Sequence, residues 1–176
     1  MNNCVTLHLL NDAALEQAVK ALQEANRIEF YGNGGSGIIA TDAYHKFMRT
    51  GISCIAHTDS YFRIMGVGLL SKNSVVIGIS HSGSNKGLLE ALEVAKARGA
   101  KIIAITSYQK SALSQLTDIT LYTSTRETEF RTEASSSRLA QLSLIDTLYV
   151  GLSLQRQEET LKHLQSIRET ISMRRK

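Results

Sequence analysis

The fold of this chain is decided by the stretch Gly78-Ile79-Ser80-His81-Ser82-Gly83-Ser84-Asn85-Lys86-Gly87, which continues an apolar run that starts at Ser74. A buried strand ends there, and the leucines from Leu88 onward begin a helical pattern. The small, flexible residues between them predict a tight turn. Such a turn points backbone N–H groups and the positive end of a helix dipole at one spot. Three serine hydroxyls add donors to that spot, so the stretch predicts a cradle for a phosphate or another small anion.

Short apolar strands alternate with helical patterns on both sides of this stretch. Strands are predicted at 28–31, 52–57, 75–79, 101–106 and 119–123, and helices at 13–26, 37–50, 61–70, 88–98, 111–117, 134–154 and 158–172. This alternation is typical of βαβ units, so we expect an α/β fold: a three-layer α/β/α sandwich around a five-stranded parallel sheet. No linker interrupts it. We therefore expect a single domain over 1–176, with an N-terminal helix in 1–26, a core over 27–154, and a C-terminal helix with a basic tail over 155–176.

Composition narrows the class of protein. The chain has 176 residues, of which 43% are hydrophobic and 20% charged, as in an ordinary soluble domain. No apolar run is long enough to cross a membrane, and no secretory signal is visible. Cys4 and Cys54 lack the spacing of metal ligands, which favours reduced thiols, a cytoplasmic location and no metal site. Most of the net charge of +4 lies after residue 155, which we interpret as a solvated helix and tail rather than a nucleic-acid surface.

A second glycine-rich turn, Gly32-Asn33-Gly34-Gly35-Ser36-Gly37, follows the first strand. Its spacing also fits a dinucleotide-binding turn, but that interpretation needs an acidic residue at the end of the second strand. Asp59 comes late there and suits a helix N-cap equally well. Ligands bind at the carboxyl ends of parallel strands, where both turns lie. Together the turns predict a site that holds a phosphorylated ligand, and its binding residues are Gly34, Ser36, Ser80, Ser82, Gly83 and Ser84.

Titratable residues supply candidates for catalysis. The polar loop 124–133 carries Glu127, Glu129 and Glu133, each of which has the chemistry of the general base that a sugar-phosphate isomerase needs. The alternative is a solvated loop with a helix-capping acid. His81 lies inside the serine turn and is the other candidate, whereas we expect His45 to be packed beside Phe47. Ser111 is expected to cap the short helix that follows it.

Three motifs resemble the SIS (sugar isomerase) domain, and the resemblance extends from about residue 13 to 154. They are Gly32-x-Gly34-x-Ser36, Ile79-Ser80-x-Ser82-Gly83-Ser84, and Ala104-Ile105-Thr106-Ser107 with Ser111-x-Leu113. A further segment resembles the ligand-sensing domain of RpiR-type transcription regulators. It comprises Glu127-Thr128-Glu129-Phe130-Arg131, then Ser137-Arg138, Gln141 and Asp146-x-Leu148.

This resemblance implies a phosphorylated sugar or sugar acid as ligand, phosphate contacts from the serines of the two turns, no cofactor, and a homodimer or tetramer. Only one amphipathic helix precedes the first strand, which is too little for a helix-turn-helix domain, so we do not expect the chain as given to bind DNA. Two functions remain open. One is the effector-sensing module of an RpiR-type regulator of carbohydrate metabolism. The other is a stand-alone aldose–ketose sugar-phosphate isomerase, or a related lyase, with a glutamate base.

Overall fold

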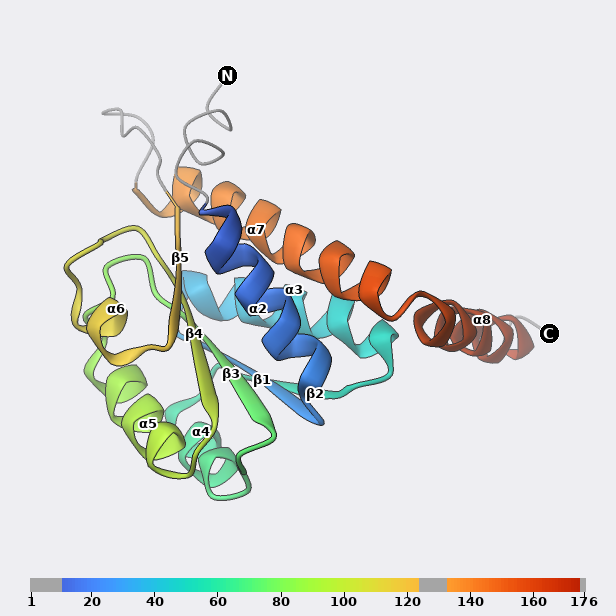
Figure 1. Cartoon of the computed structure of the whole chain (residues 1–176), viewed down its shortest axis with the longest axis horizontal. Coiled ribbons are helices and arrows are strands. Elements are labelled where there is room, and N and C mark those ends of the chain that lie inside the picture. The colour runs from blue at the N-terminus through green and yellow to red at the C-terminus, as the bar shows by residue number, and fades with distance from the viewer. Residues whose placement is uncertain (1–10, 124–132, 175–176) are drawn as a thin grey trace.

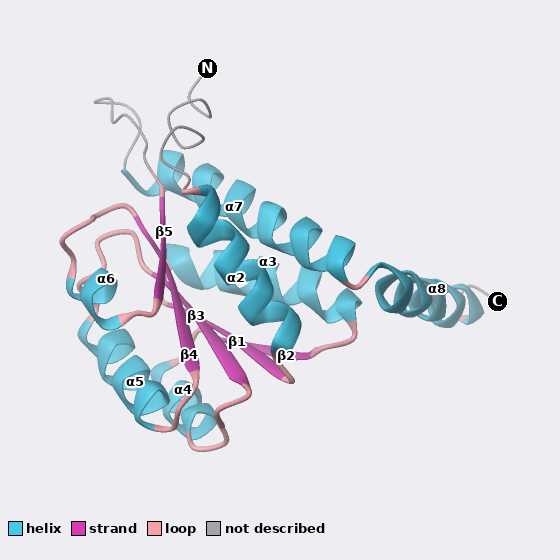
Figure 2. Ribbon diagram, viewed as in Figure 1, coloured by secondary structure: helices cyan, strands magenta, loops and turns pink. Residues whose placement is uncertain are grey.

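The computed structural model describes residues 11–123 and 133–174, except for the side chains of 133–136. Its centre is an all-parallel sheet of five strands in the order β2-β1-β3-β4-β5 (Figure 2). The strands are β1 (Arg27–Gly32), β2 (Ser53–His57), β3 (Ser74–Ile79), β4 (Lys101–Thr106) and β5 (Ile119–Tyr122). The predicted fold class is confirmed.

Helices cover both faces of the sheet (Figure 1). One face carries α2 (Asp12–Glu24), α3 (Gly35–Phe47) and α7 (Glu133–Gln155), whose buried residues form one core cluster with the strands. The other face carries α4 (Ser60–Val67), α5 (Lys86–Ala97) and α6 (Ala112–Leu116), which enclose a second cluster. A short 3-10 helix, η1 (Met48–Thr50), follows α3. These are the three layers that the alternating pattern predicts.

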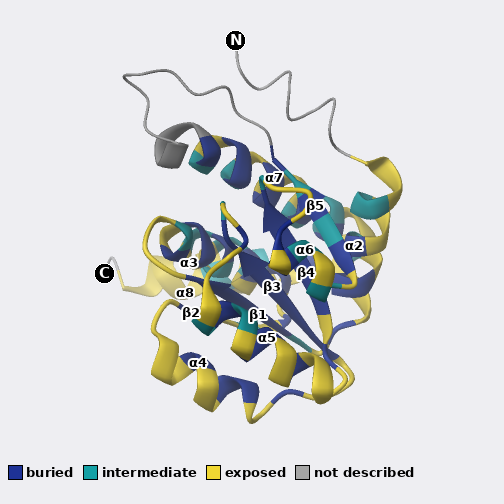
Figure 3. Ribbon diagram, turned by 90° about the vertical axis from the view of Figure 1, so that its left-hand side faces the viewer, coloured by how far each residue is buried: buried dark blue, intermediate teal, exposed yellow. Residues whose placement is uncertain are grey.

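The last helix, α8 (Gln157–Met173), extends away from the body of the domain (Figure 1). Only Thr160 of α8 is buried, and Figure 3 shows the helix as mostly exposed. His163 packs over Gly51, just after η1, at a place where any Cβ on residue 51 would collide with the imidazole ring. This contact fixes the direction in which α8 leaves the domain. None of the described helices is long and apolar enough to cross a membrane.

The strand order places the ends of β1 and β3 side by side. Gly32 and Ile79, the last residues of the two strands, are register partners. From β1 the chain crosses to β2 through α3, and from β3 it crosses in the opposite direction to β4 through α5. This is the topological switch point of the sheet, where a crevice opens and where ligands bind in open α/β folds.

Local signals in the sequence explain several of these helix ends. The side chain of Asn11 accepts a hydrogen bond from the backbone N–H of Ala14 at the start of α2. Asp59 accepts from Tyr61 and Phe62 at the start of α4, and Ser111 accepts from Ser114 at the start of α6. These capping bonds satisfy N–H groups that have no partner within the helix. Because Asp59 acts as the predicted N-cap, it does not supply the ribose-binding acid of a dinucleotide site.

Candidate functional site

A cavity of about 330 Å³ lies at the carboxyl ends of β1 and β3. It is lined by Asn33, Ser36, Ile79, Ser80, His81, Ser82, Asn85 and Leu88. Its size is at the lower end of the range for small-molecule sites. Two larger hollows exist, between α2 and α7 and beside α4, but neither gathers hydroxyls and helix N-termini in this way. We therefore take the switch-point cavity as the candidate site.

The serine turn after β3 is held in shape by its own side chains. The Ser80 hydroxyl is buried and accepts a hydrogen bond from the Gly83 N–H at 3.1 Å. The hydroxyls of Ser82 and Ser84 lie 2.9 Å apart, and both residues are exposed. Gly83 has a φ of 63°, a left-handed conformation that favours glycine. The turn is thus folded without a ligand, and the Ser82 hydroxyl remains at the cavity wall.

The turn after β1 leaves the start of α3 open to a ligand. Gly34 is the N-cap residue, with a φ of 53°, and no side chain caps this helix. The first turn of α3 also contains no acidic residue. The positive end of the helix dipole and its backbone N–H groups are therefore available to an anion, with the half-buried Ser36 beside them. The neighbouring helix α5 also starts at this edge, where Asn85 caps it through the Leu88 N–H at 2.9 Å.

His81 is held at the edge of the cavity by the loop after β4. Its Nδ1 lies 2.9 Å from the Ser107 hydroxyl, which in turn lies 2.9 Å from the Thr123 hydroxyl. The ring also packs edge-on against Tyr108, with 5.6 Å between the ring centroids. An imidazole fixed in this way has the geometry of a general acid or base. Sequence analysis identified His81 but did not identify Ser107 as its partner.

The predicted site residues divide into three groups. Ser36, Ser80, Ser82 and His81 line the cavity, whereas Gly34, Gly83 and Ser84 belong to its turns without lining it. Glu127 and Glu129 lie outside the described residues, and the side chain of Glu133 does as well. The prediction for His45 was wrong. Its side chain is exposed and pairs with Arg49, because a residue two positions before the buried Phe47 faces the opposite side of a helix.

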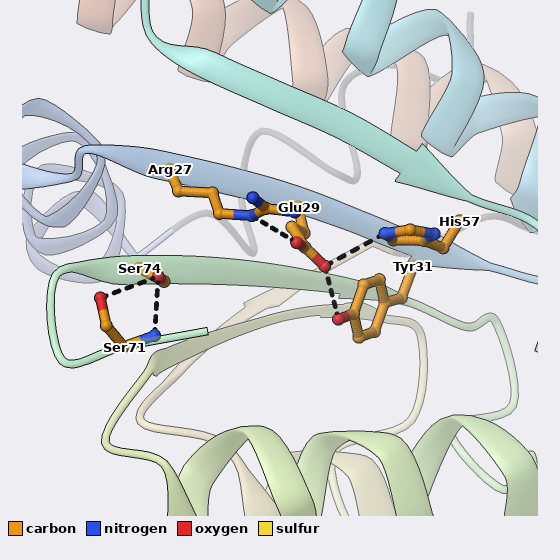
Figure 4. A network of polar contacts seen from close by, with 6 residues as sticks. All are labelled: Arg27, Glu29, Tyr31, His57, Ser71 and Ser74. Atoms are coloured by element: carbon orange, nitrogen blue, oxygen red, sulfur yellow. Dashed lines mark hydrogen bonds and ion pairs between the residues drawn. The ribbon is translucent and has the colours of Figure 1, made fainter. Parts of the chain in front are cut away.

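A buried polar network lies along β1 below the cavity (Figure 4). Glu29 is fully buried and accepts hydrogen bonds from Arg27 and from the Tyr31 hydroxyl, both at 2.6 Å. His57 Nε2 lies 3.3 Å from the same carboxylate. Burial alone would raise the pKa of Glu29, but the hydrogen bonds from His57, Tyr31 and Arg27 outweigh it and hold the pKa below its ordinary value. Burial and the bond to this carboxylate raise the pKa of Tyr31.

Sequence analysis missed two features near the cavity, Asn33 and the buried Arg63. Arg63 lies on α4 and donates to the side chain of Asn33 at 2.7 Å. Within the described parts of the chain, no group of three or more His, Cys, Asp or Glu side chains comes together to hold a metal.

Sequence comparison identifies one family. A family model described as the SIS domain matches residues 21–151. An uncharacterised HTH-type transcriptional regulator of Caldanaerobacter subterraneus is 39% identical over 170 residues, which cover 97% of this chain and 60% of the relative. The uncharacterised HTH-type transcriptional regulator YbbH of Bacillus subtilis is 36% identical over 171 residues, with the same coverage of 97% and 60%. The chain thus spans about three fifths of the length of these curated relatives.

Solved structures agree with the fold. The sugar isomerase domain of an RpiR transcription factor from Sphaerobacter thermophilus superposes with a TM-score of 0.86 at 23% identity, covering 96% of this chain and 92% of the other. NanR of Vibrio vulnificus, complexed with ManNAc-6P, gives 0.86 at 24% identity, covering 96% and 64%. The E. coli CFT073 protein c3406, in complex with arabinose 5-phosphate, gives 0.72 at 25% identity, covering 86% and 90%.

Proposed function

The chain belongs to the SIS domain family, and on that premise we propose that it binds a phosphorylated sugar and serves as the effector-sensing module of an RpiR-type regulator of carbohydrate metabolism. One observation carries the proposal: the uncapped start of α3 and the hydroxyls of Ser36 and Ser82 surround a single cavity at the switch point. These groups are neutral or positive donors, which suit the oxygens of a phosphate dianion. NanR, complexed with ManNAc-6P, and c3406, with arabinose 5-phosphate, are neighbours of this fold.

The regulator relatives support sensing rather than turnover as the role of the site. Both relatives are named HTH-type transcriptional regulators. In such a protein the sugar would change the affinity for DNA, and DNA would change the affinity for the sugar by the same factor. A sensor of phosphorylated metabolites works in the cytoplasm, and the free thiol of Cys54 is consistent with a reducing compartment.

Thermal unfolding of the whole chain tests the binding site. A ligand at about 100 times its Kd stabilises a protein by about 2.7 kcal/mol, which corresponds to a Tm increase of about 5–10 °C in a domain of this length. We expect this increase with the correct phosphosugar from a panel of hexose and pentose phosphates, and almost none with the unphosphorylated sugar. Ser82→Ala should reduce the increase. Ser53→Ala, an exposed serine at the opposite edge of the sheet, should not. Equal increases from both sugars would contradict a phosphate site.

An aldose–ketose isomerase is the second candidate, because His81 is held by Ser107 at the edge of the cavity. Incubation with hexose and pentose phosphates in deuterated buffer, followed by NMR, detects interconversion or exchange at C2 of the sugar. We expect neither for a sensor. Turnover that survives repurification and is lost in His81→Gln, or in a glutamine variant of Glu127, Glu129 or Glu133, would establish the enzyme and refute the sensor.

We also propose that the functional unit is a homodimer in which α8 of one copy lies in the groove between α2 and α7 of the other. This groove has a volume of about 1080 Å³, and its apolar residues include Val150 and Leu154, which are 51% and 67% exposed. Along α8, Leu161 and Ile171 are exposed and Leu164 and Ile167 are half-buried, all at helical spacing. The contact of His163 with Gly51 directs α8 away from its own groove, which leaves a second copy as the occupant.

Charge supports this pairing. Acidic residues outnumber basic ones in the groove, where Glu16, Glu24 and Asp146 accompany Lys20. From Leu161 onward the opposite holds for the sequence, in which Lys162, Arg168, Arg174, Arg175 and Lys176 accompany Glu169. Light scattering of the whole chain should give a dimer, and Leu161→Asp with Ile171→Asp should give a folded monomer. A dimer that survives both changes, or a wild-type monomer at micromolar concentration, would contradict this interface.

A further inference from the structure

A fully buried arginine lies beside the candidate site. Arg63 of α4 has no solvent exposure, and its Nη2 donates to Oδ1 of Asn33 at 2.7 Å. The same nitrogen reaches the backbone carbonyls of Gly32 and His57, each at 3.4 Å. The guanidinium carbon lies 5.6 Å from the centre of the Tyr31 ring. Arg63 therefore connects α4 to the turn that forms one wall of the cavity.

The polar contacts of this guanidinium are incomplete. Its Nε and Nη1 have no hydrogen-bond partner among the described residues. Burial lowers the pKa of Arg63, but an arginine remains protonated at neutral pH. A buried charge with few partners is costly to a fold, so its presence calls for a compensating role. The strongest contact it makes is with Asn33, which lines the cavity.

This contact determines which atoms Asn33 can offer to a ligand. A carboxamide has an oxygen that accepts and an NH₂ group that donates, and its orientation is fixed by the network around it. Arginine only donates, so Oδ1 of Asn33 must face Arg63. The NH₂ group then points away from Arg63. Since Asn33 is exposed and lines the cavity, that group is available to a ligand oxygen.

We propose that Arg63 is a positioning residue that turns the amide of Asn33, so that Asn33 donates a hydrogen bond to an oxygen of the sugar and helps to select the ligand. This inference rests on the proposed phosphosugar site. The serine hydroxyls and the start of α3 hold the phosphate, which leaves Asn33 for the sugar. A ligand without an accepting oxygen at this place is rejected, because the Asn33 donors would lose their water partners and gain none.

Asn33→Asp separates this role from a purely structural one. The carboxylate of this variant keeps an acceptor for Arg63 and makes the bond charge-assisted, so the Tm of the free protein should not fall. It also replaces a donor by a negatively charged acceptor in the cavity. We expect the Kd of the bound phosphosugar to rise at least tenfold. Asn73→Asp is the matched control, since it makes the same charge change at an exposed position at the opposite edge of the sheet. Its Kd should stay within twofold of wild type.

Calorimetry with ManNAc-6P, arabinose 5-phosphate and glucose 6-phosphate measures these affinities, and an NMR titration with inorganic phosphate reports on the anion subsite alone. Asn33→Ala should weaken binding of the phosphosugar about five- to tenfold and leave inorganic phosphate unaffected. Arg63→Met should weaken the phosphosugar to a similar extent, and adding Asn33→Ala to it should cause no further loss, because the two residues act as a unit. If Arg63→Met does not fold, the two Asn33 variants decide the question.

The outcomes distinguish this inference from the proposed function. If wild type binds one of the sugars and Asn33→Asp binds it equally well, the positioning role is wrong and the phosphosugar site stands. If Asn33→Ala weakens inorganic phosphate as much as the phosphosugar, Asn33 contacts the phosphate and the inference is overturned. If wild type binds none of the three sugars, the proposed function fails and the inference fails with it.

Discussion

The buried carboxylate of Glu29 should be worth several kilocalories to the fold, and Glu29→Gln measures it. The variant keeps the shape of the side chain but removes the charge that three donors share. The bond from the buried Tyr31 hydroxyl is charge-assisted and is worth about 1.5–3 kcal/mol. The bond from Arg27 counts for less, about 1 kcal/mol at most, because the Arg27 side chain is 29% exposed and screened by water.

Summed with the donor that the new amide places against its neighbours, the loss is about 3 kcal/mol, in the range measured when one partner of a buried pair is removed. For a domain of this length it lowers Tm by about 6–12 °C. Tyr31→Phe removes one of the bonds and should lie between wild type and Glu29→Gln. Glu24→Gln, at an exposed position, should stay within about 0.5 kcal/mol of wild type.

The pH dependence of this loss gives a second, independent test. The pKa of Glu29 is lowered in the folded protein from an ordinary value of 4.5. Its stabilising contribution is therefore complete above pH 4.5 and disappears as the pH falls through the folded pKa. Urea unfolding of wild type and Glu29→Gln between pH 7 and 3 should give a gap in unfolding free energy that closes below pH 4.5. A gap that stays constant over this range, or a variant as stable as wild type at pH 7, would refute the reasoning.

Two further predictions follow from the backbone and from burial. Gly83→Ala should destabilise the chain by about 1–3 kcal/mol and abolish phosphosugar binding, because its φ is 63° and an added Cβ would lie 2.5 Å from the Cβ of Ser111. Gly87→Ala, with no atom closer than 3.9 Å, is the control for chemical denaturation and calorimetry. Burial raises the pKa of Cys54 to about 11, so in a Cys4→Ser background iodoacetamide should alkylate it about a hundredfold more slowly at pH 7.5 than a free thiol, with a rate that climbs steadily above pH 9.

The fold was predictable because its signals are local. Each strand is a short apolar run, and helix starts such as those at Asn11, Asp59 and Ser111 carry a side chain that caps the first turn. Boundaries moved by one to three residues where glycine obscured them. The helix predicted from residue 37 begins at Gly35, since the glycine turn before it needs only Gly34 to change direction.

The candidate site was only partly predictable. Ser36, Ser80 and Ser82 were brought together by topology alone, because the ends of neighbouring parallel strands must meet. Asn33 was missed because an asparagine between glycines is also typical of an ordinary turn. Its function depends on Arg63, which is 30 positions later in the chain. No periodic pattern records such a distant pair, and the same is true of Glu29 and His57.

These missed residues share a task that the predicted ones do not perform. A turn made largely of glycine loses more conformational entropy on folding than any other kind of turn, so it needs support from outside itself. Arg63 supplies that support by binding the carbonyl of Gly32 and the side chain of Asn33, while Glu29 anchors Tyr31 one residue before the turn. The sequence motif thus provides the groups that contact the ligand, and buried charges under the motif hold those groups in place before the ligand arrives. A site prepared in this way binds with less loss of entropy, which is the property that a metabolite sensor needs at low ligand concentration.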